Sequence, residues 1–326
     1  MPYRLLPLVF LAVAWTAAGC GGGAPPEGAV EIDLDKKSEE RLLRHWFGGY
    51  LGPEAGDPFE AGLLAADGDR YYLFPARLPE PWQDALGAAA ADGLLDWDEA
   101  GAFLEATYGE ARGLPETLAA LREAVPYGEP DSAWFSVEID GVMTEARRRV
   151  FVPLPAMRSA LAGYHERGER LIYPVGTTLV GEHWLDGARA EVTAMTKRPD
   201  GEWDFYVYGR DGRLARATET GPRPLRSPTQ CVGCHVGSRL FEPEKSFPAE
   251  AGRGPYGPRA VHTAVRDADG VADVVAFFDE HAKRSDTVLG IYNTLFVTEL
   301  LQRRAVGRLS AEDAALLDGL RLEDGE

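Results

Sequence analysis

The pattern of apolar and polar residues divides the chain into regions of different periodicity. Between residues 39 and 128 apolar residues recur at helical spacing, which predicts a helical N-terminal domain. Residues 129–247 are instead rich in β-forming residues separated by Asp-Gly turns, a pattern typical of antiparallel strands. Residues 248–326 begin as a loop rich in glycine and proline and return to helical spacing from about residue 271.

The middle region predicts an antiparallel meander with one inserted helix. The expected strands cover residues 134–139, 142–152, 177–184, 189–197 and 203–208, and the helix covers 155–167. In the last strand, Trp203, Phe205 and Val207 should share one face, because side chains alternate along a strand. The fold class is therefore α+β, with an antiparallel β-sheet domain flanked by helical regions.

Three shorter patterns refine the flanking regions. The run 71–74 is predicted to be a strand or a core loop, and the sequence from Asp92 to Glu99 resembles the second half of an EF-hand loop. Alanines stand at its first two ligand positions, so we expect a helix–loop–helix without strong calcium affinity. Near the end of the chain, Ser310 and Asp313 form a possible capping box for a helix over 311–317.

Composition and charge narrow the classes of partner. The 326 residues carry a formal net charge of −18, from 34 Lys and Arg against 52 Asp and Glu. Nucleic acid is excluded as an expected partner, because phosphate binding depends on Lys and Arg. An acidic surface favours solubility, or a basic partner such as a redox protein.

The N-terminus predicts export and a lipid anchor. Arg4 precedes an apolar run, Leu5 to Ala18, that is too short to span a bilayer comfortably. Small residues directly before Cys20 resemble a bacterial lipobox, in which the cysteine becomes the lipidated first residue of the mature protein. Residues 1–19 would then be a signal peptide and 20–38 a flexible tether, and the protein would lie in the bacterial cell envelope, facing the periplasm or the exterior. An ordinary signal peptide with an incidental cysteine is the alternative.

The sequence Cys231-Val232-Gly233-Cys234-His235 is the attachment signature of a c-type haem. Each thiol adds to one vinyl group of the porphyrin, and the histidine binds the iron as an axial ligand. A zinc site would require about four N or S ligands at fixed spacings, and the chain has no second Cys pair. A redox dithiol should open a helix within a βαβ unit, whereas an irregular stretch with two prolines precedes this motif. We therefore expect one covalently attached haem c held by Cys231, Cys234 and His235.

The middle region resembles the cytochrome P460 family, which includes the cytochromes c′-beta. The resemblance covers about residues 130–247. It rests on the helix near Met157, the stretch from Tyr173 to Val180, the sequence Gly201-x-Trp203-x-Phe205-Tyr206 and the haem motif. It implies an antiparallel β domain, often dimeric, with five-coordinate iron and an open apolar distal side. Members of the family oxidise hydroxylamine, using a lysine–porphyrin crosslink, or bind gases such as nitric oxide.

One position departs from that family. The crosslinking lysine of the hydroxylamine-oxidising members lies five residues after the glycine that matches Gly176, and Gly181 stands there in this chain. Lys197 is the nearest alternative but does not match the motif position. The crosslink, and with it hydroxylamine oxidation, is therefore not expected.

The residue on the second axial side of the iron decides whether a haem carries electrons or binds a ligand. Met195 and His183 are the candidate sixth ligands, and the remaining histidines, including His45, are interpreted as surface or structural. Glu182 and Glu191 are the carboxylates that could serve as a base, although strand carboxylates usually point to water.

The sequence thus predicts a lipid-anchored monohaem cytochrome that binds a small nitrogen-oxide ligand, such as nitric oxide, or transfers electrons to a partner protein. A hydroxylamine-oxidising enzyme is the first alternative. A haem sensor whose helical flanking domains dock a partner is the second.

Overall fold

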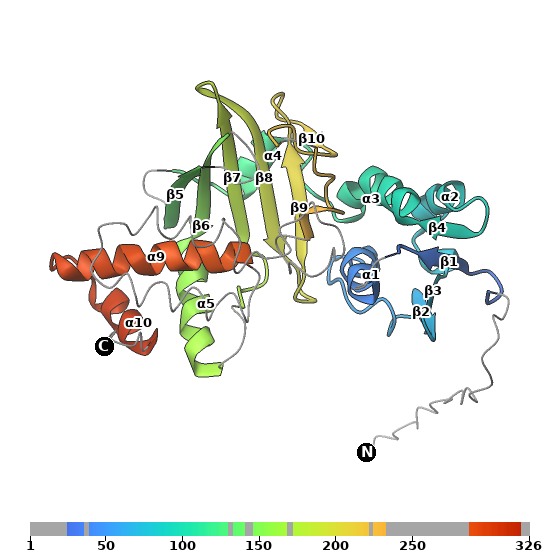
Figure 1. Cartoon of the computed structure of the whole chain (residues 1–326), viewed down its shortest axis with the longest axis horizontal. Coiled ribbons are helices and arrows are strands. Elements are labelled where there is room, and N and C mark those ends of the chain that lie inside the picture. Colours follow the sequence, from blue (N-terminus) through green and yellow to red (C-terminus); the bar gives the residue numbers. More distant parts are fainter. Residues whose placement is uncertain are drawn as a thin grey trace, which may run out of the picture.

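The computed structural model describes residues 25–35, 39–129, 133–140, 146–167, 172–221, 224–232 and 287–320. Over these residues the chain forms an α+β fold with two largely antiparallel sheets and several helices, which confirms the fold class at that level (Figure 1). Cys20, Cys234 and His235 lie outside the described residues, as do the expected signal peptide and the loop after residue 247.

The N-terminal unit, defined here as β1 to α3, combines a small sheet with helices. Its four strands are ordered β2-β3-β1-β4, with β1 parallel to β4 and the other neighbours antiparallel. The strands are β1 (Val30–Asp33), β2 (Leu64–Asp67), β3 (Arg70–Leu73) and β4 (Leu94–Asp96). The helices are α1 (Glu39–Gly48), α2 (Glu80–Ala89) and α3 (Trp97–Ala111), with short 3₁₀ turns at Gly49–Leu51 and Pro75–Arg77.

The interpretation of residues 39–128 as helical is therefore only partly right. The run 71–74 supplies most of β3, as one of the two predicted options allowed, and β1 arises from the expected tether. These strands have three or four residues each, too few to show a period of two in the sequence. Contacts between neighbouring strands stabilise them. One example is the ion pair between Glu31 of β1 and Arg70 of β3, at 2.5 Å.

The segment that resembles half of an EF-hand is a helix–loop–helix, as predicted. Between α2 and α3, the side chain of Asp92 accepts a hydrogen bond from the Leu94 amide at 3.1 Å. Asp96 accepts from the Glu99 amide at 2.8 Å, and Glu99 accepts from the Asp96 amide at 3.0 Å. These carboxylates therefore form a turn and a capping box that begins α3.

The larger sheet is the antiparallel meander that the sequence predicted. Its six strands are ordered β10-β9-β8-β7-β6-β5, so each pairs with its neighbour in the chain. They are β5 (Trp134–Asp140), β6 (Arg147–Pro153), β7 (Thr178–Leu185), β8 (Ala188–Lys197), β9 (Trp203–Tyr208) and β10 (Leu214–Ala215). Helix α5 (Leu154–Arg167) is inserted between β6 and β7, where the sequence placed it.

The two faces of the larger sheet belong to different apolar clusters. One face, which we call the outer face, packs against α4 (Leu118–Ala124) and Tyr127 through residues such as Val192 and Ala194. The other, which we call the site face, carries Met195 and Phe205 and belongs to a cluster that continues into α1 and α3. All six residues of β9 are buried, so both faces are covered there.

The C-terminal helices pack against the site-face side of the sheet. They are α9 (Thr287–Ala305) and α10 (Ala311–Leu320). The ring of Phe296 lies 5.3 Å from that of Phe135 in β5, and Arg158 of α5 pairs with Asp313 at 2.9 Å. The Ser310 hydroxyl accepts a hydrogen bond from the Asp313 amide at 3.1 Å, so Ser310 caps α10 and provides one half of the predicted capping box.

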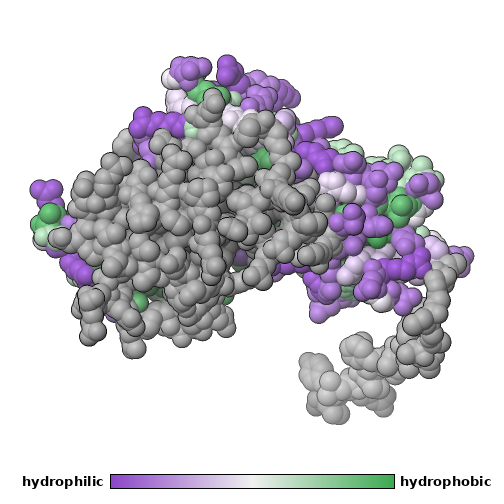
Figure 2. All heavy atoms as spheres, in the orientation of Figure 1, coloured by the Kyte–Doolittle hydropathy of each residue, from purple (hydrophilic) through white to green (hydrophobic). Residues whose placement is uncertain are grey.

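The face of the molecule shown in Figure 2 is mainly polar over its described residues. In Figure 2 the coloured part of the molecule is largely hydrophilic, with hydrophobic residues interspersed over the N-terminal unit. Single exposed apolar residues of this kind are normal on a soluble surface and do not by themselves mark an interface. Among the described helices, none combines the length and the apolar character that crossing a membrane would require.

Candidate functional site

The segment that carries the first haem-motif cysteine, residues 224–232, is held between the larger sheet and the N-terminal unit. On one side the Ser227 hydroxyl donates a hydrogen bond to the Phe205 carbonyl of β9 at 3.1 Å. On the other side the Arg226 guanidinium pairs with Glu105 of α3 at 3.3 Å. The segment is therefore fixed to both parts of the fold just before the motif begins.

Cys231 packs against the large apolar cluster that includes the site face as well as α1 and α3. Its side chain is half-buried and packs against the cluster that contains Met195, Trp203, Phe205 and Val232. A planar apolar group attached to this sulfur would start at that cluster rather than in bulk solvent. The position of Cys231 thus defines where a candidate haem site begins.

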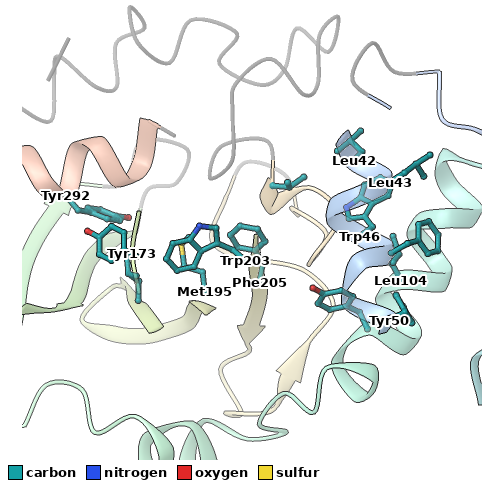
Figure 3. Packing of buried hydrophobic residues seen from close by; sticks show 14 of the residues in the cluster. Leu42, Leu43, Trp46, Tyr50, Leu104, Tyr173, Met195, Trp203, Phe205 and Tyr292 are labelled. Carbon is teal, nitrogen blue, oxygen red and sulfur yellow. The ribbon is translucent and has the colours of Figure 1, made fainter. Parts of the chain in front are cut away.

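Aromatic residues surround the apolar part of the site face. In Figure 3, Met195, Trp203 and Phe205 lie between Tyr173 on one side and Trp46 of α1 on the other. The Tyr173 ring lies 6.0 Å from the Trp203 ring in an edge arrangement. Each of these residues is at most 4% exposed, so the cluster shields this part of the sheet from water.

Met195 lies on the face of β8 opposite Val192 and Ala194. It belongs to the site-face cluster, whereas Val192 and Ala194 belong to the outer-face cluster. Its cross-strand partner in β9 is Phe205, and its side chain is 4% exposed. The methionine therefore lies beside the Cys231 cluster, and its role as an iron ligand stays a prediction.

Lys197 also belongs to the site face. Its ammonium group lies 5.0 Å from the centre of the Trp203 ring and donates a hydrogen bond to the Gly201 carbonyl. A cation over an indole ring is stabilised by the negative face of the aromatic system. Lys197 is thus close to the apolar cluster, although it does not occupy the lysine position of the resembled family.

The other end of the site face is polar and centred on His183. Its Nδ1 lies 3.0 Å from the Thr220 hydroxyl and 3.1 Å from a Glu191 carboxylate oxygen. Its Nε2 lies 3.3 Å from the Thr193 hydroxyl. Both ring nitrogens of this predicted ligand are therefore within hydrogen-bonding reach of neighbouring side chains.

The protonation of this polar cluster follows from its burial. Burial, together with the positive charge of Arg148, lowers the pKa of His183 to about 2, so the imidazole is neutral. The Thr220 hydroxyl donates to Glu191 at 2.5 Å, and the Glu219 amide donates to the second Glu191 oxygen. The carboxylate accepts and cannot donate, so the His183 proton is placed on Nδ1.

The two candidate carboxylate bases lie on opposite faces of the sheet. Glu191 is 1% exposed on the site face, and Glu182 is 5% exposed on the outer face, where it accepts from Arg122 at 2.7 Å. The expectation that strand carboxylates point to water is wrong for both residues, because each is buried and accepts hydrogen bonds from neighbouring groups. Only Glu191 shares a face with Met195, and both of its oxygens already accept hydrogen bonds.

Gly181 leaves little space for the lysine of the resembled family. A Cβ atom at this position would lie 3.0 Å from the Thr193 hydroxyl and 3.7 Å from Arg148. We expect Gly181→Lys to lower the free energy of unfolding by about 1–3 kcal/mol through overpacking, with a further loss from the adjacent Arg148 charge. Denaturant titration measures this change, and Gly181→Ala, which adds only the Cβ, should lose less. Equal stability of the lysine variant and the wild type would show that the strand accommodates a side chain here.

His45 of α1 is a site residue that the sequence pattern did not single out. It is 1% exposed, its ring centre lies 5.7 Å from that of Phe205, and its Nδ1 lies 3.0 Å from a Glu202 carboxylate oxygen. Burial lowers the pKa of His45, although the hydrogen bond to Glu202 opposes this. The sequence prediction allowed a packed histidine here, and the structure adds its partner at the start of β9.

A buried arginine joins α1 to the turn between β8 and β9. The Arg198 guanidinium donates to the His45 carbonyl at 2.8 Å and to the Tyr108 hydroxyl at 2.9 Å, and it pairs with Asp200. The Tyr108 hydroxyl in turn donates to Asp204 at 2.6 Å. The network therefore fixes the position of α1 relative to the sheet edge that carries Phe205.

No protein-family model, curated protein or solved structure matches this chain. Within the described ranges, no group of three or more His, Cys, Asp and Glu side chains is arranged to hold a metal ion. The family resemblance therefore stays a prediction from the sequence.

Proposed function

We propose that this chain is an exported, lipid-anchored, monohaem c-type cytochrome that binds a small nitrogen-oxide ligand or transfers electrons. The observation that supports the proposal is the packing of Cys231, the first cysteine of the haem motif, against the apolar cluster to which the site face belongs. Cys231 and Cys234 would hold the porphyrin through thioether bonds, and His235 would bind the iron on one side. Cys20 would carry the lipid.

The described residues fit such a group. The site face offers aromatic and aliphatic side chains to a flat apolar ring, and a buried imidazole, His45, lies beside the same cluster. A bound haem would supply reversible one-electron chemistry at iron and an axial position for a ligand. The contribution of the chain would be to attach the ring and to keep water from the iron.

Hydroxylamine oxidation has less support. Gly181 has no side chain to form the crosslink, and its surroundings oppose a larger residue. Glu191, the carboxylate of the site face, already accepts hydrogen bonds at both oxygens and is 1% exposed. A general base must reach the proton that it removes, and this carboxylate is occupied.

A sensor whose N-terminal region docks a partner also has less support. Glu105 of α3 pairs with Arg226 in the motif segment, and α1 shares the apolar cluster of the site face. These surfaces of the N-terminal unit therefore make contacts within the molecule instead of being open to a partner.

Covalent haem attachment provides the direct test. Full-length protein made in a bacterial host with the attachment machinery should keep a haem stain on a denaturing gel. The double variant Cys231→Ser/Cys234→Ser should lose it completely, because serine has no thiol to form a thioether bond with the porphyrin. Cys20→Ser is the matched control, which should keep the haem and lose its membrane anchorage. Wild-type protein without haem under these conditions would refute the proposed function.

A further inference from the structure

The His45 ring is a neutral imidazole, and one of its two nitrogens, Nδ1, already has a hydrogen-bond partner. Nδ1 lies 3.0 Å from the Glu202 carboxylate, which is itself close to the buried Arg198. An ionised carboxylate only accepts hydrogen bonds, so the proton of the imidazole is on Nδ1 and Nε2 presents a lone pair.

That lone pair has no hydrogen-bond partner among the described residues. His45 is 1% exposed, so water does not replace the missing donor. Buried polar atoms are nearly always satisfied, and each exception calls for an explanation such as a missing ion or group. The arrangement matches that of metal-binding histidines, which donate one ring N–H to a carboxylate and offer the other nitrogen to the metal.

The location of His45 connects it with the haem motif. Its ring packs against Phe205, whose carbonyl accepts the hydrogen bond from Ser227 in the motif segment. Cys231, four residues further on, packs against the same apolar cluster. His45 and the segment that leads to Cys231 therefore both contact Phe205 of β9.

His183 and Met195, the other two candidate ligands, are less suited to bind iron. Both nitrogens of His183 lie within hydrogen-bonding distance of Thr220, Glu191 or Thr193, at 3.0 to 3.3 Å. Met195 is 4% exposed and packs in the apolar cluster, where a methionine is well placed simply to fill space. Of the three, His45 alone combines a carboxylate-oriented ring with an unpartnered nitrogen in the part of the chain that the structure describes.

We infer that His45 Nε2 is a second ligand of the haem iron, in addition to the motif histidine His235, and that the N-terminal unit supplies it. The inference rests on the proposed function and makes it more specific. Iron with two imidazole ligands is six-coordinate and carries electrons, and a gas could bind only by displacing His45. The cytochrome would then differ from the five-coordinate proteins that its middle region resembles.

Spectroscopy of the unmodified full-length holoprotein tests the inference first. Ferric iron should be low-spin by electron paramagnetic resonance, and its near-infrared magnetic circular dichroism should be that of two nitrogen ligands rather than of nitrogen and thioether. High-spin iron in the resting protein would overturn the inference and leave the proposed function in place. Protein without haem would instead refute the proposed function.

Variants then identify the ligand. His45→Ala should convert the ferric protein to high spin, and added imidazole should restore the low-spin spectrum by filling the space left by the side chain. Leu43→Ala, which shortens another fully buried residue of α1, is the packing control and should stay low-spin. If His45→Ala does not fold, His45→Met should keep six-coordinate iron with the spectrum of a thioether ligand. A low-spin His45→Ala protein, or loss of low-spin iron in His183→Ala instead, would overturn the inference.

Discussion

Replacing Arg198 by methionine is expected to lower the free energy of unfolding by about 3–5 kcal/mol, because it leaves buried charges without their partner. The guanidinium is 1% exposed, and the carboxylate of Asp200 beside it is 8% exposed. Burial opposes the charge on Arg198, but Tyr108, Asp200 and Asp204 together raise its pKa. Methionine has a similar length and no charge, so the variant separates the ion pairs from packing. Equilibrium denaturation of the two proteins measures the difference.

Arg44 provides the matched control for that experiment. It also makes ion pairs, with Glu40 and Asp57, but its side chain is 38% exposed. Exposed pairs contribute about 0–1 kcal/mol, so Arg44→Met should change the stability little. Similar losses of unfolding free energy in the two variants would show that the contribution of the Arg198 network to stability does not depend on its burial.

Acid is expected to destabilise the protein through His183. Its folded-state pKa is about 2, against 6.5 for an exposed histidine, so below pH 6.5 the unfolded chain binds a proton that the folded chain does not. Stability rises with pH wherever the unfolded state binds more protons, so it must fall as the pH is lowered through this window. Between about pH 7 and pH 4.5 this single group accounts for a loss of about 2.5 kcal/mol.

His183→Gln isolates that contribution. Glutamine keeps a neutral side chain that both donates and accepts hydrogen bonds, but it does not titrate. The unfolding free energies of the two proteins should therefore converge as the pH falls, because only the wild type loses this contribution. Curves that stay parallel from pH 7 to pH 4.5 would show that His183 is protonated in the folded protein.

The larger sheet was predictable because its signals are local. Asp186-Gly187 stands at the hairpin turn that joins β7 to β8, and the β-forming runs are long enough to identify. The small sheet was not predictable in the same way. Strand β1 pairs in parallel with β4, more than sixty residues later, and a partner at that distance leaves no periodic signal in either segment.

In the candidate site too, signals that are local in the sequence were predictable and contacts between distant residues were not. The haem motif is contiguous and visible in the sequence. The partner of His45 could not be predicted, because Glu202 is 157 positions away and approaches only through the packing of α1 on β9. The burial of Glu182 and Glu191 was missed for a related reason. The groups that donate hydrogen bonds to them lie in other parts of the sequence.

The apolar cluster shared by α1 and β9 has a consequence for how the chain matures. A chain is synthesised from its N-terminus, so α1 is made long before β9, and the buried side of α1, including Leu42 and Trp46, first exists without the residues that later cover it. Uncovered apolar surface in a partly folded chain is prone to aggregation. The acidic character of the protein, with a net charge of −18, opposes such association through mutual repulsion during that interval.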